Sequence, residues 1–381
     1  MPVFIDKNFM TEKKDSLKNS DYYEIKQRLK LAAERAYSEK YQRITDLKAP
    51  VDIDIHSYYS ELAYRWPIEG SQGKYENRDG ERWPGRFCAH HDAMKALCIG
   101  SMIMSSAGYY LEDRKFLDKT AELMKEWFVD SQTAMAPNFS CAQSLRFVHT
   151  GSFYGIIEGA FLLYIIQSAG LLEAAGGYDE LLKGVRKWFS SLLDWLCNSE
   201  FGQNEKKTKN NHAIWYNTIV SSIASFVGDD AVFKDTCENF CNLMDQQIGE
   251  DGFLTKELTR TNSYFYSFFT MEAMTLMYEV ARIKGVDLWG ATTNKGRSMT
   301  KLLDTMLPYY INPFLWKYSE ISGNIVTDSL TYQIAALRLC RNDYQKANIK
   351  RQKQLDPLRP RASRIGYLFL LPGYDSDINE K

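Results

Sequence analysis

The 381-residue sequence has only five histidines and seven cysteines, and no two cysteines form a CxxC pair. Zinc sites are usually built from closely spaced cysteines and histidines, so these spacings give no signal of a metal site. The odd number of cysteines also argues against a disulfide framework. Cys237 and Cys241 lie four residues apart in a helical pattern, so we expect them to share one helix face as small hydrophobic residues.

The sequence also lacks an excess of charge of one sign, since 47 basic and 48 acidic residues give a formal net charge of −1. A near-neutral chain gives no reason to expect a nucleic acid or an anionic membrane as a partner. The most apolar stretch, residues 156–166, is interrupted by Glu158 and Gly159, so we expect no membrane span. A monomer is compatible with the sequence, which leaves the oligomeric state open.

The first residues contain no apolar core of a secretory leader. We therefore expect a periplasmic or secreted location if a leader has been removed, and a cytoplasmic location otherwise.

Several common catalytic motifs are missing as well. The sequence contains no P-loop, no G-x-G-x-x-G after a strand, no G-x-S-x-G and no H-E-x-x-H. Nucleotide-dependent and serine-hydrolase chemistry therefore have no support, and we expect neither a metal nor another cofactor. His90 and His91 stand next to Asp92 without a clean ligand spacing, and a locally hydrogen-bonded helix start explains them.

Helical periodicity dominates what is present. It predicts helices over residues 22–40, 91–107, 114–128, 153–169, 178–197, 211–227, 230–248, 266–284, 294–306 and 327–339. Strand signals are limited to Ile53–His56 and Tyr367–Leu371, and residues 198–210 are predicted as a loop. No linker-like break divides the chain, so the sequence predicts one all-α domain over residues 1–381. Residues 49–85 are too long and too rich in Gly and Pro for a simple connection, which is typical of a lid or binding loop.

The segment KTKNNHAIWYNTIV is the most informative part of the chain. Asn210 and Asn211 are good helix N-caps, and His212 follows in the first turn. The positive potential of a helix N-terminus favours a neutral imidazole, which is the form that a general base needs. A capped helix with an incidental histidine would explain the same residues.

A second segment, ELTRTNSYFYSFFTMEAM, places Arg260 before an aromatic-rich helix that contains Tyr264 and Tyr266. An arginine and a tyrosine in one cleft could serve as carboxylate clamp and proton donor. A core tyrosine with a satisfied hydroxyl is the alternative explanation.

Six motifs together resemble the alginate lyase family of polysaccharide lyases. They are HSYYSELAYRWP, WFVDSQTAMAPNFSCAQ, HTGSFYGIIE, NNHAIWY, LTRTNSYFYSFFTMEAM and GVDLWG. They follow one another in the family's order from about residue 56 to residue 290. The resemblance implies an all-α fold, a single (α/α) toroid formed by an incomplete barrel of helical hairpins. It also implies a lid loop at about 56–85, and a polar C-terminal tail follows at about 375–381.

The resemblance further implies β-elimination at a 4-linked uronic acid in an anionic polysaccharide. It assigns the catalytic roles to Asn211, His212, Arg260 and Tyr266, with Asn210 in support. It implies that the substrate-binding residues are Tyr64, Trp66, Tyr75, Arg78, Asn138, Gln143, Arg146, His149 and Tyr264. For the lid residues, a structural loop packed on the rim is the alternative.

Three positions depart from the family pattern. Arg65 stands where the lid commonly has a Trp, Ser152-Phe153 replaces a Gly-Arg pair, and His149 occupies a site that is commonly Asn. All three are expected near the substrate, so they affect the choice of uronic acid more than the reaction. We expect a mannuronate-rich alginate as substrate, with glucuronan or another glucuronate polymer as the alternative. A glycoside hydrolase, which would need two opposed carboxylates, and a non-catalytic glycan-binding toroid are the remaining readings.

Overall fold

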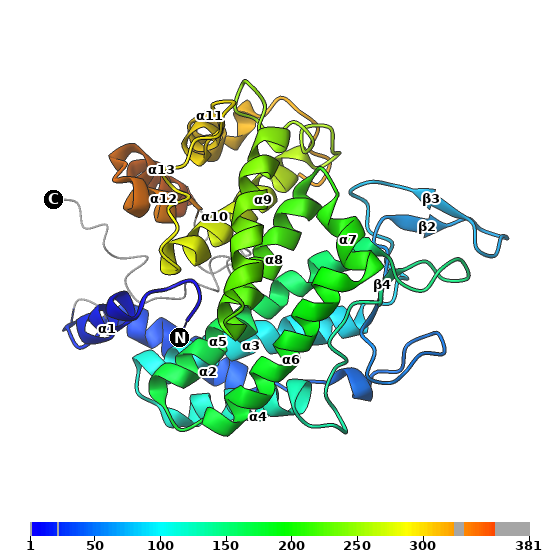
Figure 1. Ribbon diagram of the computed structural model, residues 1–381, viewed down its shortest axis with the longest axis horizontal. Helices are drawn as coiled ribbons and strands as arrows, with labels where there is room; N and C mark the ends of the chain where they lie inside the picture. The colour runs from blue at the N-terminus through cyan, green and yellow to red at the C-terminus, as the bar shows by residue number, and fades with distance from the viewer. Residues whose placement is uncertain (1, 21–22, 324–330, 355–381) are drawn as a thin grey trace. The chain divides into compact units, whose positions relative to one another are not determined.

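The structure is a computed structural model that describes residues 2–20, 23–323 and 331–354. Over these ranges α-helices dominate, which confirms the all-α prediction (Figure 1). The α-helices are α1 (Lys7–Ser16), α2 (Tyr23–Ser38), α3 (Ala89–Tyr110), α4 (Arg114–Phe128), α5 (Leu162–Ala175), α6 (Asp179–Asn198), α7 (Glu200–Lys206), α8 (Asn211–Val227), α9 (Asp230–Gln247), α10 (Ser263–Ile283), α11 (Met299–Ile311), α12 (Thr331–Leu339) and α13 (Asn342–Gln354). The 3-10 helices are η2 (Ile44–Asp46), η3 (Phe153–Phe161) and η4 (Pro313–Leu315), and the strands are β1 (Tyr59–Glu61), β2 (Arg65–Pro67), β3 (Tyr75–Asn77) and β4 (Cys141–Ser144).

The chain forms two compact units, which are described separately. Unit 1 comprises Met1–Glu205, Ser222–Asp229 and Tyr367–Lys381, and unit 2 comprises Lys206–Ser221 and Asp230–Gly366. The last segment of unit 1 lies outside the described residues, and so does the predicted polar tail at 375–381. The single catalytic domain expected over residues 1–381 stays a prediction.

Several predicted boundaries differ from the structure. The strand predicted at Ile53–His56 is wrong, because these residues lead into a turn and β1 begins at Tyr59. The strand predicted at Tyr367–Leu371 lies outside the described residues. The loop predicted at 198–210 contains the short helix α7, which forms because the Ser199 hydroxyl accepts a hydrogen bond from the Gly202 backbone N–H at 3.0 Å.

Amphipathic helices build unit 1. On α6 the buried side chains recur at helical spacing and form one apolar stripe: Leu182, Val185, Trp188, Phe189, Leu192, Leu193 and Leu196. The segment Phe153–Ala175, which combines η3 and α5, is long and apolar enough to cross a membrane. However, 89% of its most apolar window is buried inside the protein, as expected for a core helix.

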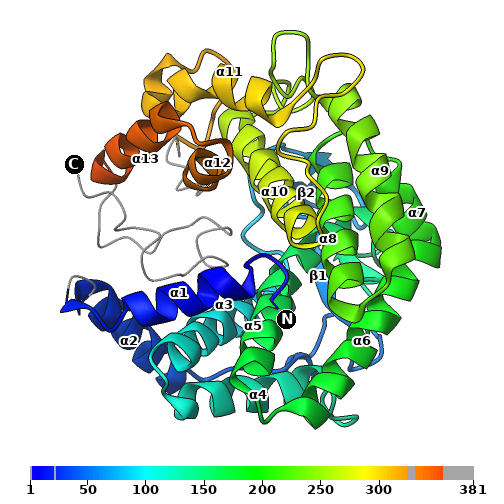
Figure 2. The same cartoon turned by 60° about the vertical axis from the view of Figure 1, so that its left-hand side comes forward.

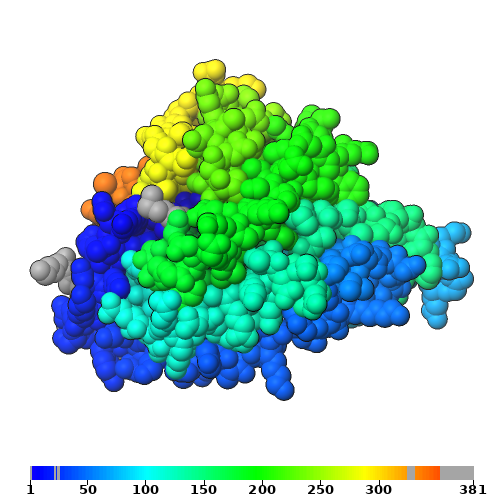
Figure 3. Space-filling model, turned by 60° about the horizontal axis from the view of Figure 1, so that its bottom comes forward, coloured from blue at the N-terminus to red at the C-terminus, as the bar shows by residue number. Residues whose placement is uncertain are grey.

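Two small sheets position the predicted lid of unit 1. β1 pairs with β4 in parallel, with Tyr59 opposite Cys141, and β2 pairs with β3 in an antiparallel hairpin. The hairpin projects from the helices of this unit (Figure 1), and its light blue atoms lie at one end of the surface in Figure 3. The predicted lid therefore contains a short two-stranded hairpin within its irregular backbone.

Unit 2 is built around α10, almost all of whose residues are buried. The hydroxyls of Ser267, Thr270 and Thr275 donate to backbone carbonyls four residues earlier, so their burial leaves these hydrogens satisfied. α12 lies beside α10, and α13 follows it along the chain (Figure 2).

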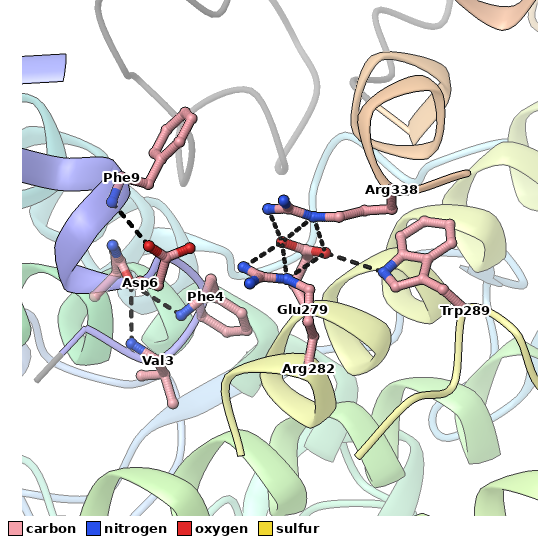
Figure 4. Close-up of polar contacts among 9 residues, drawn as sticks. Val3, Phe4, Asp6, Phe9, Glu279, Arg282, Trp289 and Arg338 are labelled. Atoms are coloured by element: carbon pink, nitrogen blue, oxygen red, sulfur yellow. Dashed lines mark hydrogen bonds and ion pairs between the residues drawn. The ribbon is translucent and has the colours of Figure 1, made fainter. Parts of the chain in front are cut away.

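A buried carboxylate in unit 2 carries two ion pairs. Glu279 of α10 is fully buried, and its carboxylate accepts from Arg282 at 3.1 Å, Arg338 at 2.8 Å and the Trp289 indole N–H at 3.0 Å (Figure 4). The arginine side chains keep 27% and 21% of their surface exposed. A buried carboxylate is stable only with such charged partners, so this cluster fixes α12 and the segment after α10 to α10.

We predict that Glu279→Gln lowers the free energy of unfolding by about 2–3 kcal/mol, because it removes the buried negative charge that pairs with Arg282 and Arg338. This is below the cost for fully buried pairs, since both guanidinium groups keep contact with water. Urea unfolding would measure it. Glu238→Gln is the control, since Glu238 is 69% exposed and lies 3.9 Å from Lys234, and its effect should stay within about 0.5 kcal/mol. An equal effect of the two variants would contradict the prediction.

Candidate active site

The N-terminus of α8 is capped as the sequence predicts. The Asn210 side-chain oxygen accepts from the backbone N–H of His212 at 3.2 Å, and its carbonyl accepts from the buried side chain of Gln247 at 2.9 Å. The carbonyl of Gln247 in turn accepts from Thr255 N at 3.1 Å. Gln247 thus links the start of α8 to the loop before α10, which contains Arg260.

The loop before α10 places the Glu257 carboxylate against Asn211, the first residue of α8. Glu257 is fully buried, and its Oε1 accepts from the backbone N–H of Asn211 at 2.7 Å. The Asn211 amide nitrogen lies 3.1 Å from Oε1 and 3.0 Å from Oε2. Asn211 is fully buried too, and its Oδ1 has no hydrogen-bond partner within the described part of the chain. The predicted donor amide thus points its N–H groups at Glu257 in this structure.

The charge state of Glu257 reflects opposing effects. Burial raises the pKa of the Glu257 carboxyl above its ordinary value of 4.5, whereas the hydrogen bonds from Asn211, the positive charge of Arg260 and the electrostatic effect of His212 lower it. Burial prevails, so the pKa is raised. His212 is half-buried and acts electrostatically on Glu257, which places the imidazole, Arg260 and this carboxylate in one neighbourhood.

Arg260 and Tyr266 are in direct contact. The guanidinium carbon of Arg260 lies 3.7 Å from the centroid of the Tyr266 ring. Tyr266 stands in the first turn of α10 and keeps 8% of its surface exposed, and Arg260 is half-buried. The contact combines cation–π attraction with stacking, and it brings a positive charge next to the phenol.

Tyr264 belongs to the core of unit 2. It is fully buried, its hydroxyl donates to the carbonyl of Tyr309 at 3.2 Å, and its ring packs edge-on against Trp316. The structure thus gives Tyr264 a packing role, and its expected substrate contact stays a prediction.

The four lid residues lie in unit 1. The Trp66 indole N–H donates to the carbonyl of Glu81 at 2.9 Å, and Arg78 lies 4.5 Å over the Trp66 ring while pairing with Glu76 at 2.8 Å. The backbone carbonyl of Tyr64 accepts from the backbone N–H of Arg78 at 2.9 Å. These contacts tie the two ends of the hairpin together.

Tyr75 connects the hairpin to Arg146. Its hydroxyl donates to the Arg146 carbonyl at 3.1 Å, and the Arg146 guanidinium pairs with Glu61 at 2.7 Å. Glu61 is buried and also accepts from the Tyr59 hydroxyl at 3.1 Å and from the Phe87 backbone N–H at 2.8 Å. Arg146 is therefore oriented by a carboxylate, and its charge is balanced within unit 1.

Three further predicted residues lie on the segment 138–149 of unit 1. Asn138 accepts from the backbone N–H of Ser140, and the His149 imidazole Nδ1 lies 2.8 Å from the Gly151 carbonyl. Gln143 has a positive φ of 48°, and its backbone N–H donates to the Ser60 hydroxyl. A non-glycine residue in this region is strained, and the hydrogen bond to Ser60 holds it there.

The predicted residues thus form two groups, one in each unit. Unit 2 brings together Asn210, Asn211, His212, Arg260 and Tyr266, and unit 1 links Tyr75 to Arg146. Two carboxylates that sequence reasoning missed, Glu257 and Glu61, each orient a predicted residue. Local spacing in the sequence gives no signal for either carboxylate, because each one contacts a residue far along the chain. Among the described residues, no three His, Cys, Asp or Glu side chains are grouped as a metal site would need.

Comparison with solved structures identifies the fold. An alginate lyase from Bacteroides ovatus is 23% identical and matches with a TM-score of 0.87 over 97% of this chain and 98% of that chain. Alginate lyase A1-III from Sphingomonas species A1 is 15% identical and matches with a TM-score of 0.50 over 90% of this chain and 94% of that chain. No curated protein matches the sequence.

The expected fold class, the α/α toroid, is confirmed by these matches. The family model described as alginate lyase matches residues 47–316, which is well over half of the chain. The protein is therefore an enzyme of the polysaccharide lyase class. The chain belongs to the alginate lyase family.

Proposed function

We propose that this protein cleaves a 4-linked polyuronate, with a mannuronate-rich alginate as the first choice, by β-elimination that leaves a 4,5-unsaturated uronic acid end. The observation that carries the proposal is the family match over residues 47–316, which includes Asn211, His212, Arg260 and Tyr266. The contact between Arg260 and Tyr266 supports it, because the reaction needs a positive charge and a proton-transferring group close together.

The chemistry sets demands that these residues can meet. The C5 proton of a uronic acid is weakly acidic, because its removal adds negative charge to a group that already bears a carboxylate. The positive charge of Arg260 and an amide donor from Asn211 would neutralise that carboxylate, with Asn210 holding the start of α8 in place. His212 and Tyr266 would then share the transfer of protons at C5 and O4.

The division of labour depends on the sugar. In mannuronate and glucuronate, H5 and O4 lie on the same side of the ring, so Tyr266 could remove the C5 proton and return a proton to O4. In guluronate the two atoms lie on opposite faces, so His212 would act as the base and Tyr266 as the acid. The proposed substrate therefore gives Tyr266 both roles and leaves His212 to stabilise charge.

The predicted residues of unit 1 are proposed as further contacts to the polymer. Trp66 and Tyr75 offer aromatic faces for stacking, and Arg78 and Arg146 offer N–H donors to carboxylates and hydroxyls. Tyr64 from the lid, and Asn138, Gln143 and His149 from the segment 138–149 that contains β4, are proposed as supporting contacts. An anionic polysaccharide is the proposed partner.

Glucuronan is the second candidate substrate, because glucuronate differs from mannuronate only at C2 and the catalytic quartet is the same for both. A panel of poly-mannuronate, poly-guluronate, glucuronan, pectate and hyaluronan would test both candidates. Formation of the unsaturated product would be followed by ultraviolet absorbance. The expected result is the highest kcat/KM on poly-mannuronate, and absence of product from every polymer would contradict the proposal.

We predict that turnover does not require a metal ion, because the proposed roles use a cationic side chain, an amide, an imidazole and a phenol. Exhaustive chelation followed by gel filtration should leave kcat unchanged. Loss of activity that one particular metal restores would contradict this prediction.

A further inference from the structure

The Asn211 amide leaves one of its ends unpaired whichever way it is turned. In the structure, both oxygens of Glu257 accept from the amide nitrogen, and the buried Oδ1 lacks a donor among the described residues. An unpaired buried polar atom is destabilising, so it calls for a functional explanation. This orientation also presents an acceptor, where a substrate carboxylate would need a donor.

A proton on Glu257 would reverse the arrangement. The neutral acid has one accepting oxygen and one O–H donor. Its Oε1 would still accept from the Asn211 backbone N–H, now 2.7 Å away. If the Asn211 amide were inverted, its oxygen would take the place of the amide nitrogen, which now lies 3.0 Å from Oε2. The protonated Oε2 would then donate a hydrogen bond to that amide oxygen. The amide N–H groups would then occupy the place of the present Oδ1 and could donate to a carboxylate.

We propose that Glu257 is a positioning residue whose protonation decides which end of the Asn211 amide is available, so that binding of a uronate carboxylate takes up one proton from solvent. This inference rests on the proposed function, because it requires a carboxylate ligand. The proton moves from buffer to the Glu257 carboxylate, and no other bond is made or broken. The titratable groups that act electrostatically on Glu257 are Arg260 from its own loop and His212 from α8.

Burial favours the proton on Glu257, since it raises the pKa of this carboxyl. A second negative charge brought close by the ligand would favour it further. The hydrogen bonds from Asn211, the charge of Arg260 and the electrostatic effect of His212 act in the opposite sense. The inference requires that a bound carboxylate shifts this balance toward the protonated acid.

Calorimetric titration with oligo-mannuronate, and in parallel oligo-glucuronate, would test the inference. It would be run in buffers of different ionisation enthalpy and on the Tyr266→Phe background, so that the ligand is not cleaved. The expected result at about neutral pH is uptake that approaches one proton per site. Glu257→Gln is the matched variant, because its amide can accept from the Asn211 N–H and donate to Oδ1 as the neutral acid would. It should bind without proton uptake.

The same variant separates positioning from a purely structural role. Glu257→Gln should keep kcat within about tenfold of the wild type, whereas Glu257→Leu, which cannot orient the amide, should lower kcat/KM by about 10–100-fold. Absence of uptake in the wild-type site would overturn the inference. So would uptake that persists in Glu257→Gln and disappears in His212→Gln, because the imidazole would then be the acceptor.

A ligand-free measurement keeps this inference distinct from the proposed function. Because the pKa of Glu257 is raised above its ordinary value of 4.5, ionising this carboxyl lowers the free energy of unfolding. The loss of stability is absent below about that pH, and it grows with pH until the pH exceeds the folded-state pKa. The Tm of Glu257→Gln relative to the wild type should therefore rise with pH. If no polyuronate binds or is cleaved, the proposed function fails, and a pH-independent Tm difference would overturn the inference about Glu257.

Discussion

Tyr266→Phe should lower kcat by at least the ~10²–10⁴ that general acid–base catalysis typically contributes, and it should change KM much less. The variant removes the hydroxyl that we propose transfers both protons in a mannuronate or glucuronate polymer. The ring should keep its place, because its contacts with Phe265 and Arg260 do not involve the hydroxyl. Steady-state kinetics and circular dichroism on the same sample would separate lost chemistry from lost structure.

Tyr264→Phe is the matched control for this experiment. Tyr264 lies two residues earlier on α10, and its hydroxyl donates to the Tyr309 carbonyl inside the core of unit 2. Its removal should cost about 1 kcal/mol of stability and leave kcat close to the wild-type value. If Tyr264→Phe is inactive while Tyr266→Phe stays active, the catalytic role belongs to Tyr264 and the packing role to Tyr266. If both variants remain active, the proposed elimination mechanism is wrong.

The sequence could not order these two tyrosines from first principles. Residues two apart on a helix point to different faces, so one of the pair had to face the core. The neighbouring residues in the sequence do not show which tyrosine faces the core, because both lie in an aromatic-rich segment. The packing partners decide: Trp316 covers Tyr264, and Arg260 covers Tyr266.

Predictions for the helices were accurate where a cap and a periodic apolar face coincide. α8 begins at Asn211 and ends at Val227 as predicted, because Asn210 caps its start and Gly228, with a φ of 86°, follows its end. No such combination of cap and apolar face predicts α13, which is mostly polar. It packs through Tyr344 and Asn348, whose partners Tyr332 and Tyr310 lie on other helices of unit 2.

Glu257 shows the limit of sequence reasoning for the site. It is one of 48 acidic residues, most of which are expected to be solvated. Glu257 is important because its loop packs against the start of α8. Gln247 keeps the loop there: its side chain donates to the Asn210 carbonyl, and its own carbonyl accepts from the Thr255 backbone N–H. Contacts between segments some forty residues apart have no counterpart in local spacing, so chemistry on α8 could be predicted but its supporting carboxylate could not.

Arg260→Ala should lower kcat/KM by about 10²–10³-fold, through a higher KM as well as a lower kcat. The proposed carboxylate partner of Arg260 is charged before and during the reaction, so the arginine contributes to binding and to the transition state. Arg260→Lys keeps the charge but loses the planar group that stacks on Tyr266 at 3.7 Å. It should therefore recover most of the binding and only part of the turnover.

The arginine variants also test how the site is coupled to Glu257. The positive charge of Arg260 lowers the pKa of Glu257, so Arg260→Ala should raise it further. More Glu257 would then carry a proton before the ligand arrives, and proton uptake on binding should be smaller than in the wild type at the same pH. Arg260→Lys should retain the uptake, since its charge remains. Equal uptake in the wild type, Arg260→Ala and Arg260→Lys would show that the charge of Arg260 does not control the protonation of Glu257.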